Sequence, residues 1–339
     1  MKTKLFISFF FGCVIAMQLR AQDFHLTQYD AFSMYLNPAL TGNYLGEDAD
    51  YKISTVYRTQ WRPLASKPYT TYGVGYDMIY KKFGLGGYIL DNRSGGPSFN
   101  TLNAQASASY FITDPKVSPH LLNVGLQMGL FYKTFNFNQM LFESQYDYSS
   151  SQFNPGINSG EILQRNSRTN FDANMGVFYK YRDVTKKYFP FVGFSIFHAN
   201  MPMETFTTYK SRLPMRFNLQ AGCDFKIDES WTVTPMILYM NQARAWELNL
   251  GGLAYYKLNS GGNANKDVSY HLIFGANYRV KDAFMLQAGV KKDNFVLRMS
   301  YDINTSYLNS YTNGKGGFEI TLQIMGKKGV SPFKSMASF

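Results

Sequence analysis

The most regular part of the chain runs from residue 268 to residue 325, where apolar and polar residues alternate one by one. Val268 and Tyr270 fall on one parity, while Ser269 and His271 fall on the other. Three further segments continue the pattern, at 284–291, 295–303 and 318–325. Successive side chains of a strand point to opposite faces, so each segment has one apolar and one polar face. Each is about ten residues long, which is the span that a tilted strand needs to cross a bilayer.

Ten similar segments precede this part of the chain. They are expected at 51–57, 72–80, 83–89, 102–110, 122–132, 171–181, 188–197, 215–227, 231–240 and 246–258. A total of about 14 is even, as in outer-membrane barrels whose two ends both lie in the periplasm. The sequence therefore predicts an all-β fold, a transmembrane antiparallel β-barrel with an irregular N-terminal plug or periplasmic segment. The sequence is also compatible with twelve or sixteen strands. A soluble double sandwich is the other explanation of the alternation.

Four parts of the chain follow from this pattern. Residues 1–21 have the basic start and the apolar run, Leu5–Met17, of a signal peptide, with cleavage expected after Ala21. Residues 22–48 show no sustained period and form the irregular N-terminal segment, residues 49–328 form the barrel, and residues 329–339 form a C-terminal tail.

The lengths of the connections give the barrel an orientation. With the amino end in the periplasm, long loops at 61–68, 91–98, 134–169, 199–211 and 304–315 face outward. Short turns near Lys81, Asp183, Glu229 and Asp293 then face the periplasm, which is the usual outer-membrane arrangement. The long connection at 259–266 is an exception, because it falls on the periplasmic side.

The composition agrees with a barrel and excludes helical spans. Aromatic residues make up 17% of the chain, and the mean hydropathy is -0.25, with no apolar run of about twenty residues. The net charge is +11, and loss of Lys2, Lys4 and Arg20 with the signal leaves +8. In an exported strand-rich chain this charge favours outer-membrane lipid with its lipopolysaccharide phosphates, or an acidic partner, over nucleic acid. Scattered loop charge explains it equally well.

No arrangement of residues in the sequence indicates an enzyme. The four histidines have no metal-ligand spacing, and no carboxylate pair or nucleophile triad is discernible, so we expect no catalytic residue, metal or cofactor. Glycines on the inner parity make room for a plug. Charged residues on the inner parity of adjacent strands predict a charge ladder in the lumen, for which structural pairing is a better explanation than transport: Arg279, Lys291, Arg298, Asp302 and Glu319.

Several motifs carry a resemblance to a known family. They are Asp23–Tyr29, Tyr35–Gly42, Arg58–Trp61, Gly275–Arg279 and Gly316–Ile320. In this order they resemble the PorP/SprF membrane proteins of the type IX secretion and gliding apparatus of Bacteroidetes. The middle of the chain is matched only at 179–181 and 192–195, and the tail beyond residue 328 departs from the family.

This resemblance implies a non-enzymatic component of the bacterial outer membrane. Its expected partners are the periplasmic ring of the type IX machine and exported adhesins that carry a type-B C-terminal signal. The motif residues offered as partner contacts are Gln28, Tyr29, Asn37, Pro38, Arg58 and Trp61, and Trp61 is equally explained as an interfacial girdle residue. The alternative function is a channel or transporter for a hydrophobic or oligomeric solute.

Two hypotheses assign these partners to segments of the chain. The irregular segment 22–48, ordered at the periplasmic face, docks the ring. The loop at 134–169 presents Tyr, Asn and Ser residues to the exported partner.

Overall fold

The computed structural model describes residues 23–44, 49–62, 68–95, 99–114, 118–137, 140–160, 165–206, 210–258 and 270–327. The expected signal peptide at 1–21, the connection at 259–266 and the tail at 329–339 lie outside these residues.

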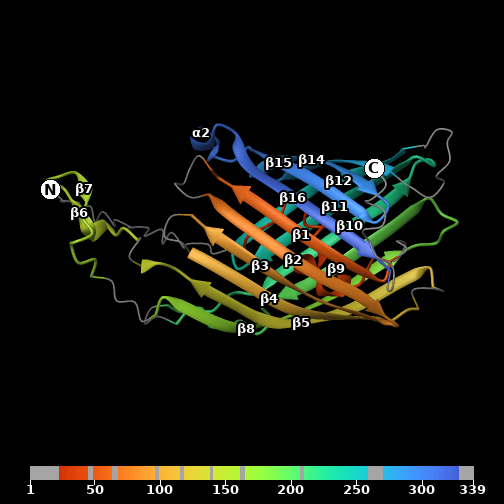
Figure 1. Cartoon of the computed structure of the whole chain (residues 1–339), viewed down its shortest axis with the longest axis horizontal. Coiled ribbons are helices and arrows are strands. Elements are labelled where there is room, and N and C mark those ends of the chain that lie inside the picture. The colour runs from red at the N-terminus through yellow and green to blue at the C-terminus, as the bar shows by residue number, and fades with distance from the viewer. Residues whose placement is uncertain are drawn as a thin grey trace, which may run out of the picture.

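Within the described residues, fourteen strands close into one antiparallel barrel (Figure 1). Neighbours in the chain pair with each other, and β1 pairs with β16 to close the sheet. The first seven strands of the barrel are β1 (Tyr51–Gln60), β2 (Tyr69–Tyr80), β3 (Phe83–Ser94), β4 (Phe99–Phe111), β5 (His120–Thr134), β8 (Ser167–Tyr181) and β9 (Tyr188–Phe197). The other seven are β10 (Arg216–Lys226), β11 (Trp231–Gln242), β12 (Ala245–Leu258), β13 (Tyr270–Arg279), β14 (Ala283–Lys292), β15 (Phe295–Asn304) and β16 (Lys315–Gly326). The predicted fold class is confirmed.

The two faces of the sheet differ as the alternation predicts. On β5, Leu126 and Met128 point outward and are more than half exposed, whereas Asn123 and Gln127 point into the lumen and are at most 1% exposed. An apolar outer face in contact with lipid and a polar interior are the arrangement of outer-membrane barrels.

The end of the barrel that carries the long loops is the one expected to face outward, and we call it the outer end and the opposite one the periplasmic end. Several strands extend further toward the outer end than the alternation indicates. The third predicted segment ends at Ile89, but β3 continues to Ser94, so the predicted loop at 91–98 shrinks to 95–98. Asn92 and Arg93 are both polar, which hides the period although both residues pair with β2. The alternation therefore marks only the lipid-facing band, because ladder hydrogen bonds continue where neither face meets lipid.

The long loop after β5 contains structure that the sequence did not predict. A short 3-10 helix, η3 (Glu143–Gln145), precedes a two-stranded hairpin of β6 (Tyr146–Asp147) and β7 (Gln152–Phe153). The ring of Tyr146 lies 5.1 Å from the rings of both Tyr148 and Phe153. This aromatic tip projects well beyond the end of the barrel (Figure 1).

Two single-turn helices lie within the N-terminal segment, and another lies in the loop before β16. They are α1 (Ser33–Leu36), η1 (Pro38–Leu40) and α2 (Asn309–Thr312). Among the described residues, no helix has the length and apolar character that a membrane span requires.

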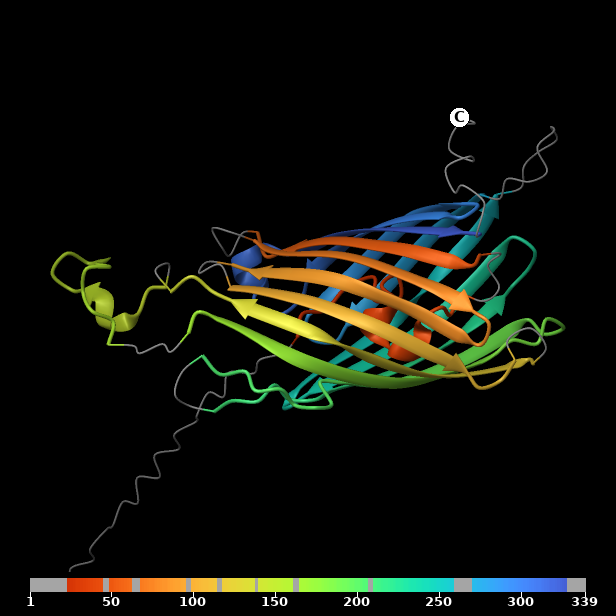
Figure 2. The same cartoon turned by 60° about the horizontal axis from the view of Figure 1, so that its bottom comes forward.

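Residues 23–44, which we call the plug, lie inside the barrel (Figure 2). At one end of the plug, Asp23 contacts His198, which follows β9, and at the other end the hydroxyl of Tyr44 donates to the carbonyl of Asp50, just before β1. The plug thus runs through the lumen from the outer end to the periplasmic end before the first strand begins. Residues 23–44 are thus a lumen plug rather than a segment displayed at the periplasmic face, and docking of the ring by this part of the chain stays a prediction.

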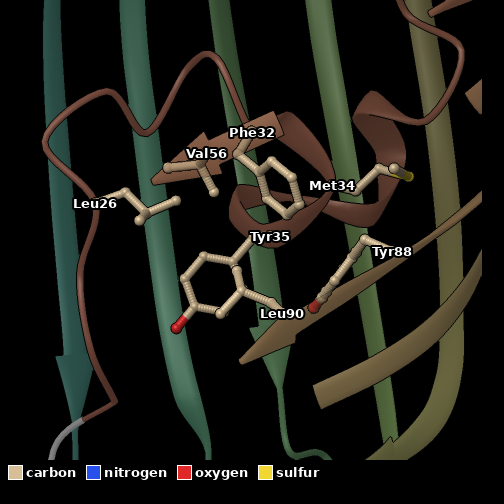
Figure 3. Packing of buried hydrophobic residues seen from close by; sticks show 7 residues of the cluster. All are labelled: Leu26, Phe32, Met34, Tyr35, Val56, Tyr88 and Leu90. Atoms are coloured by element: carbon tan, nitrogen blue, oxygen red, sulfur yellow. The ribbon is translucent and has the colours of Figure 1, made fainter. Parts of the chain in front are cut away.

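An apolar cluster packs the plug against the barrel wall (Figure 3). It contains Leu26, Phe32, Met34 and Tyr35 from the plug and Val56, Tyr88 and Leu90 from the wall. The wall residues lie on inner parities that elsewhere carry polar groups, so burial of apolar area fixes the plug on the side of β1 and β3.

Candidate functional site

One carboxylate of the last strand, β16, accepts hydrogen bonds from the backbone of the plug. The two oxygens of Glu319 accept hydrogen bonds from the backbone N–H groups of Thr27 and Gln28, each at 2.8 Å. Hydrogen bonds to an ionised acceptor are among the strongest in proteins. Because the acceptor is fully buried, this contact holds two consecutive residues of the plug at one height in the lumen.

Arg58 joins the plug to two strands at once. Its Nη1 donates to the hydroxyl of Thr27 at 2.6 Å and lies 3.2 Å from Oε2 of Glu319, while its Nη2 lies 2.8 Å from Oδ2 of Asp302. Nη2 of Arg279 lies 3.2 Å from the same Asp302 oxygen. Two guanidinium groups thus face two carboxylates, which is the balance that makes burial of charge tolerable. We call Arg58, Arg279, Asp302 and Glu319 the charge cluster.

The side chain of Gln28 adds further hydrogen bonds between the plug and the barrel wall. Its Nε2 donates to the hydroxyl of Ser300 at 3.2 Å, and its Oε1 accepts from the hydroxyl of Thr321 at 2.6 Å. Gln28 is fully buried, and these bonds use both ends of its amide. The charge cluster holds the plug's backbone, whereas this amide gives the contact its side-chain specificity.

Asn37 and Pro38 pack against a part of the barrel wall where the inward-facing residues are glycines. An ideal Cβ on Gly176 would lie 2.0 Å from Oδ1 of Asn37, and one on Gly125 would lie 2.4 Å from the backbone of Pro38. Nδ2 of Asn37 donates to the carbonyl oxygens of Val177 at 3.0 Å and of Phe194 at 3.3 Å. The prediction that inner-parity glycines make room for a plug is confirmed.

The outer end of the plug is held by a second set of charges. Oδ2 of Asp23 accepts from Nε2 of His198 at 2.8 Å and from Nη1 of Arg216 at 3.0 Å, and Nδ1 of His198 lies 2.8 Å from Asp172. Burial opposes the positive charge of His198, but the carboxylates of Asp23 and Asp172 outweigh this effect and raise its pKa to about 9. At neutral pH the ring is therefore a cation that donates from both nitrogens.

Most of the sequence-predicted residues contact the plug or belong to it. Gln28, Arg58, Arg279, Asp302 and Glu319 come together in one place, and Arg298 instead lies 2.7 Å from Asp30 of the plug. The charge ladder is thus two separate contacts. Lys291 lies nearer the periplasmic end, where it lines a cavity with Arg298 and Tyr29. Their roles in binding partners stay predictions.

Trp61 lies at the outer end of β1 rather than on the lipid-facing surface. It lines a cavity of about 380 Å³ above the plug, together with Arg58 and His198. Its φ of 55° is unusual for a bulky residue, and its ring packs edge-on against Tyr69 at 5.1 Å.

Of the outer charges, sequence reasoning included Asp23 only as the first residue of a family motif and did not single out Asp172, His198 or Arg216. Arg216 and Asp172 do fall on inner parities, which was the available signal. His198 follows the end of its strand and has a φ of 57°, so no parity assigns it to the lumen. Among the described residues, no group of three His, Cys, Asp or Glu side chains is placed to hold a metal ion.

Comparison with known proteins agrees with this geometry. The family model of the type IX secretion system membrane protein PorP/SprF matches residues 18–324. The chain belongs to this family. PorP/SprF proteins are outer-membrane components of type IX secretion, so the barrel is placed in the bacterial outer membrane. No curated protein matches the chain.

Among solved structures, the toluene transporter TbuX of Ralstonia pickettii matches this PorP/SprF barrel with a TM-score of 0.50 and 12% identity. The match covers 87% of this chain and 94% of TbuX. The toluene transporter TodX of Pseudomonas putida has a TM-score of 0.47 and 12% identity, over 89% of this chain and 93% of TodX. At this identity the likeness to TbuX shows the fold of an outer-membrane barrel alone.

Proposed function

We propose that this PorP/SprF barrel is a non-enzymatic part of the type IX machine that keeps exported adhesins with a type-B C-terminal signal at the cell surface and links them to the periplasmic ring. Family membership over residues 18–324 is the observation that carries the proposal. The filled lumen supports it, because a plug held at both ends suits a scaffold better than a pore.

The outer loop supplies a surface for the exported partner. Its hairpin exposes Tyr148 by 79% and Phe153 by 46% at a point that projects beyond the barrel. Exposed aromatic residues are common anchors in protein interfaces. The loop therefore presents a small apolar contact to a protein that arrives outside the membrane.

The test is retention of the exported adhesin on cells. Replacing Tyr146, Tyr148 and Phe153 by Ser should release the adhesin into the medium while the barrel still assembles, and trimming residues 136–166, which stops before β8, should do the same. The matched control replaces Tyr307 and Tyr311, which are exposed by 86% and 70% in the loop before β16, and should leave the adhesin on the cells. Full retention by the hairpin variant would refute this part of the proposal.

The link to the periplasmic ring needs a separate experiment. Gentle solubilisation of the outer membrane followed by affinity purification of the barrel should recover ring components. A purified barrel without any ring component, from cells whose ring is intact, would contradict the link.

Transport of a hydrophobic or oligomeric solute is the second candidate. The cavity below the plug favours it, because its lining includes five apolar side chains of one cluster: Tyr44, Met236, Leu253, Val296 and Met325. Planar bilayers distinguish the two functions. The scaffold predicts no steady conductance with the intact chain, and steady conductance favours the channel.

A further inference from the structure

The lower lumen contains a cavity of about 610 Å³ between the plug and the periplasmic ends of the strands. Its size is that of a ligand-binding pocket. Basic side chains outnumber acidic ones in its lining, with two aspartates, Asp30 and Asp224, against six cations: Lys52, Lys180, Arg182, Lys226, Lys291 and Arg298. A positive lining with low-dielectric walls attracts anions.

Ion pairs within the lining do not remove this excess. Asp224 lies 2.7 Å from Nζ of Lys180, and Asp30 lies 2.7 Å from Nη2 of Arg298. Both aspartates of the cavity are therefore already engaged. Lys226 is the last residue of β10, so excess charge extends to the periplasmic rim.

Arg298 provides a second, independent indication of a ligand. Its side chain is 2% exposed, and within the described part of the chain its Nε and Nη1 have no hydrogen-bond partner. The hydroxyl of Tyr29, which lines the same cavity, also lacks one there. Buried donors without partners are rare in native proteins because each has lost its hydrogen bonds to water and gained none in return. Nε and Nη1 lie at different edges of the guanidinium, so each is a charged donor for a separate carboxylate oxygen, and such charge-assisted bonds are strong.

The remaining lining distinguishes a peptide from a small inorganic anion. Apolar side chains, among them Leu40, Tyr44 and Met236, line the cavity together with the cations. A free phosphate gains nothing from such a surface, whereas a peptide with both acidic and apolar side chains uses both kinds of group.

We infer that this cavity binds an acidic, partly apolar peptide segment of a periplasmic protein. Carboxylates of the segment pair with the unpartnered donors of Arg298 and with the cations toward the rim, while its apolar side chains cover Tyr44 and Met236. The inference deepens the proposed link to the ring and rests on it for the identity of the partner, but the binding chemistry is a property of this chain alone.

The experiment uses the full barrel in detergent and a fluorescent peptide of alternating Glu and Leu residues. The peptide should bind, and its affinity should fall as salt rises, because charge attraction is screened. The same peptide with Gln in place of Glu should bind at least about tenfold more weakly, the loss expected from about 1.4 kcal/mol. Excess inorganic phosphate should compete only weakly.

Variants locate the binding site. Arg298→Gln should weaken binding of the acidic peptide about tenfold or more, as loss of a charge-assisted pair predicts. Because Arg298 also holds Asp30, the double variant Lys226→Gln/Lys291→Gln removes charge at the rim without touching the plug and should weaken binding as well. Lys186→Gln is the matched control, since Lys186 is exposed in the turn after β8, outside the cavity, and should bind as the wild type does.

The outcomes separate this inference from the proposed function. Equal binding of the Glu and Gln peptides, or wild-type affinity in both cavity variants, overturns it even when the barrel still co-purifies with the ring. Full displacement by phosphate at an equal concentration would mean a small-anion site and would also overturn it. Peptide binding in the expected pattern supports it even where the ring is not recovered, which would count only against the proposed partner.

Discussion

Arg58 and Glu319 lie directly opposite each other across the seam between β1 and β16, with Nη1 of the arginine 3.2 Å from Oε2 of the glutamate. Both side chains also bond to Thr27 of the plug. The contact that joins the first strand to the last is therefore the contact that holds the plug.

Glu319→Gln should loosen the plug. The amide keeps one acceptor where the carboxylate had two, and Arg58 loses a buried counter-charge, which typically costs about 3–5 kcal/mol. We expect faster proteolysis of the plug and the appearance of ion conductance in planar bilayers. Glu229→Gln, in the exposed turn before β11, is the matched control and should change neither. If Glu319→Gln shows no ion conductance and its plug is cleaved no faster than in the wild type, the carboxylate is not needed to hold the plug.

Gly176→Ala should displace the middle of the plug. The added Cβ would lie 2.0 Å from Oδ1 of Asn37, a distance that real contacts do not reach, so Asn37 must leave its bonds to β8 and β9. Hydrogen exchange of the backbone around Asn37 should rise. Gly156→Ala tests the same change in the outer loop, where only the side chain of Asn154 lies near, and should leave exchange around Asn37 as in the wild type. Unchanged exchange in Gly176→Ala would contradict the close fit.

Phe32→Ala should weaken the binding of the plug to the barrel wall and leave the ion pairs of the plug unchanged. Phe32 is 2% exposed within the apolar cluster, and its truncation should cost about 3–5 kcal/mol of plug binding. The expected readout is cleavage of residues 23–44 by added protease at a denaturant concentration that the wild type resists. Phe171→Ala removes an aromatic ring of the same size from the lipid-facing surface, where it is 52% exposed, and should leave the plug protected.

Alkaline pH should release the outer end of the plug. The pKa of His198 is about 9 in the folded chain, above its ordinary value of 6.5, so the charged ring contributes its full stabilisation below pH 6.5. That contribution falls as pH rises and is lost above about pH 9, when the ring becomes neutral beside Asp23. Cleavage by added protease near Phe24 should speed up across this range, relative to cleavage of an unstructured reference peptide. In His198→Gln this relative rate should not step near pH 9, and a step that persists there would assign the transition to another group.

Alternation of side chains sufficed to predict the barrel, because lipid outside and polar groups inside impose a period of two on every spanning strand. It failed at strand ends such as Asn92–Arg93, where both faces are polar although the ladder continues. Ile273 is an apolar exception on the polar parity of its strand. In the structure that side chain is fully buried and packs in one cluster with Tyr44, so the lumen is apolar where the plug is apolar.

The site could be predicted only in part. Inner parity places Asp302 and Glu319 in the lumen, and the Arg58 motif came from resemblance alone. Parity cannot tell which inner charges meet, since that depends on how the strands are staggered, and so it grouped Lys291 with residues that the structure keeps apart from it. The course of an aperiodic segment such as 23–44 has no local signature, and only tertiary contacts set it.

The seam between β1 and β16 has a consequence for biogenesis. Thr27 and Gln28 donate to both oxygens of Glu319, so a barrel that closed with an empty lumen would leave these buried acceptors without their backbone partners. We therefore expect the seam to close around the plug, so that one carboxylate aligns both the last pair of strands and the segment that they enclose.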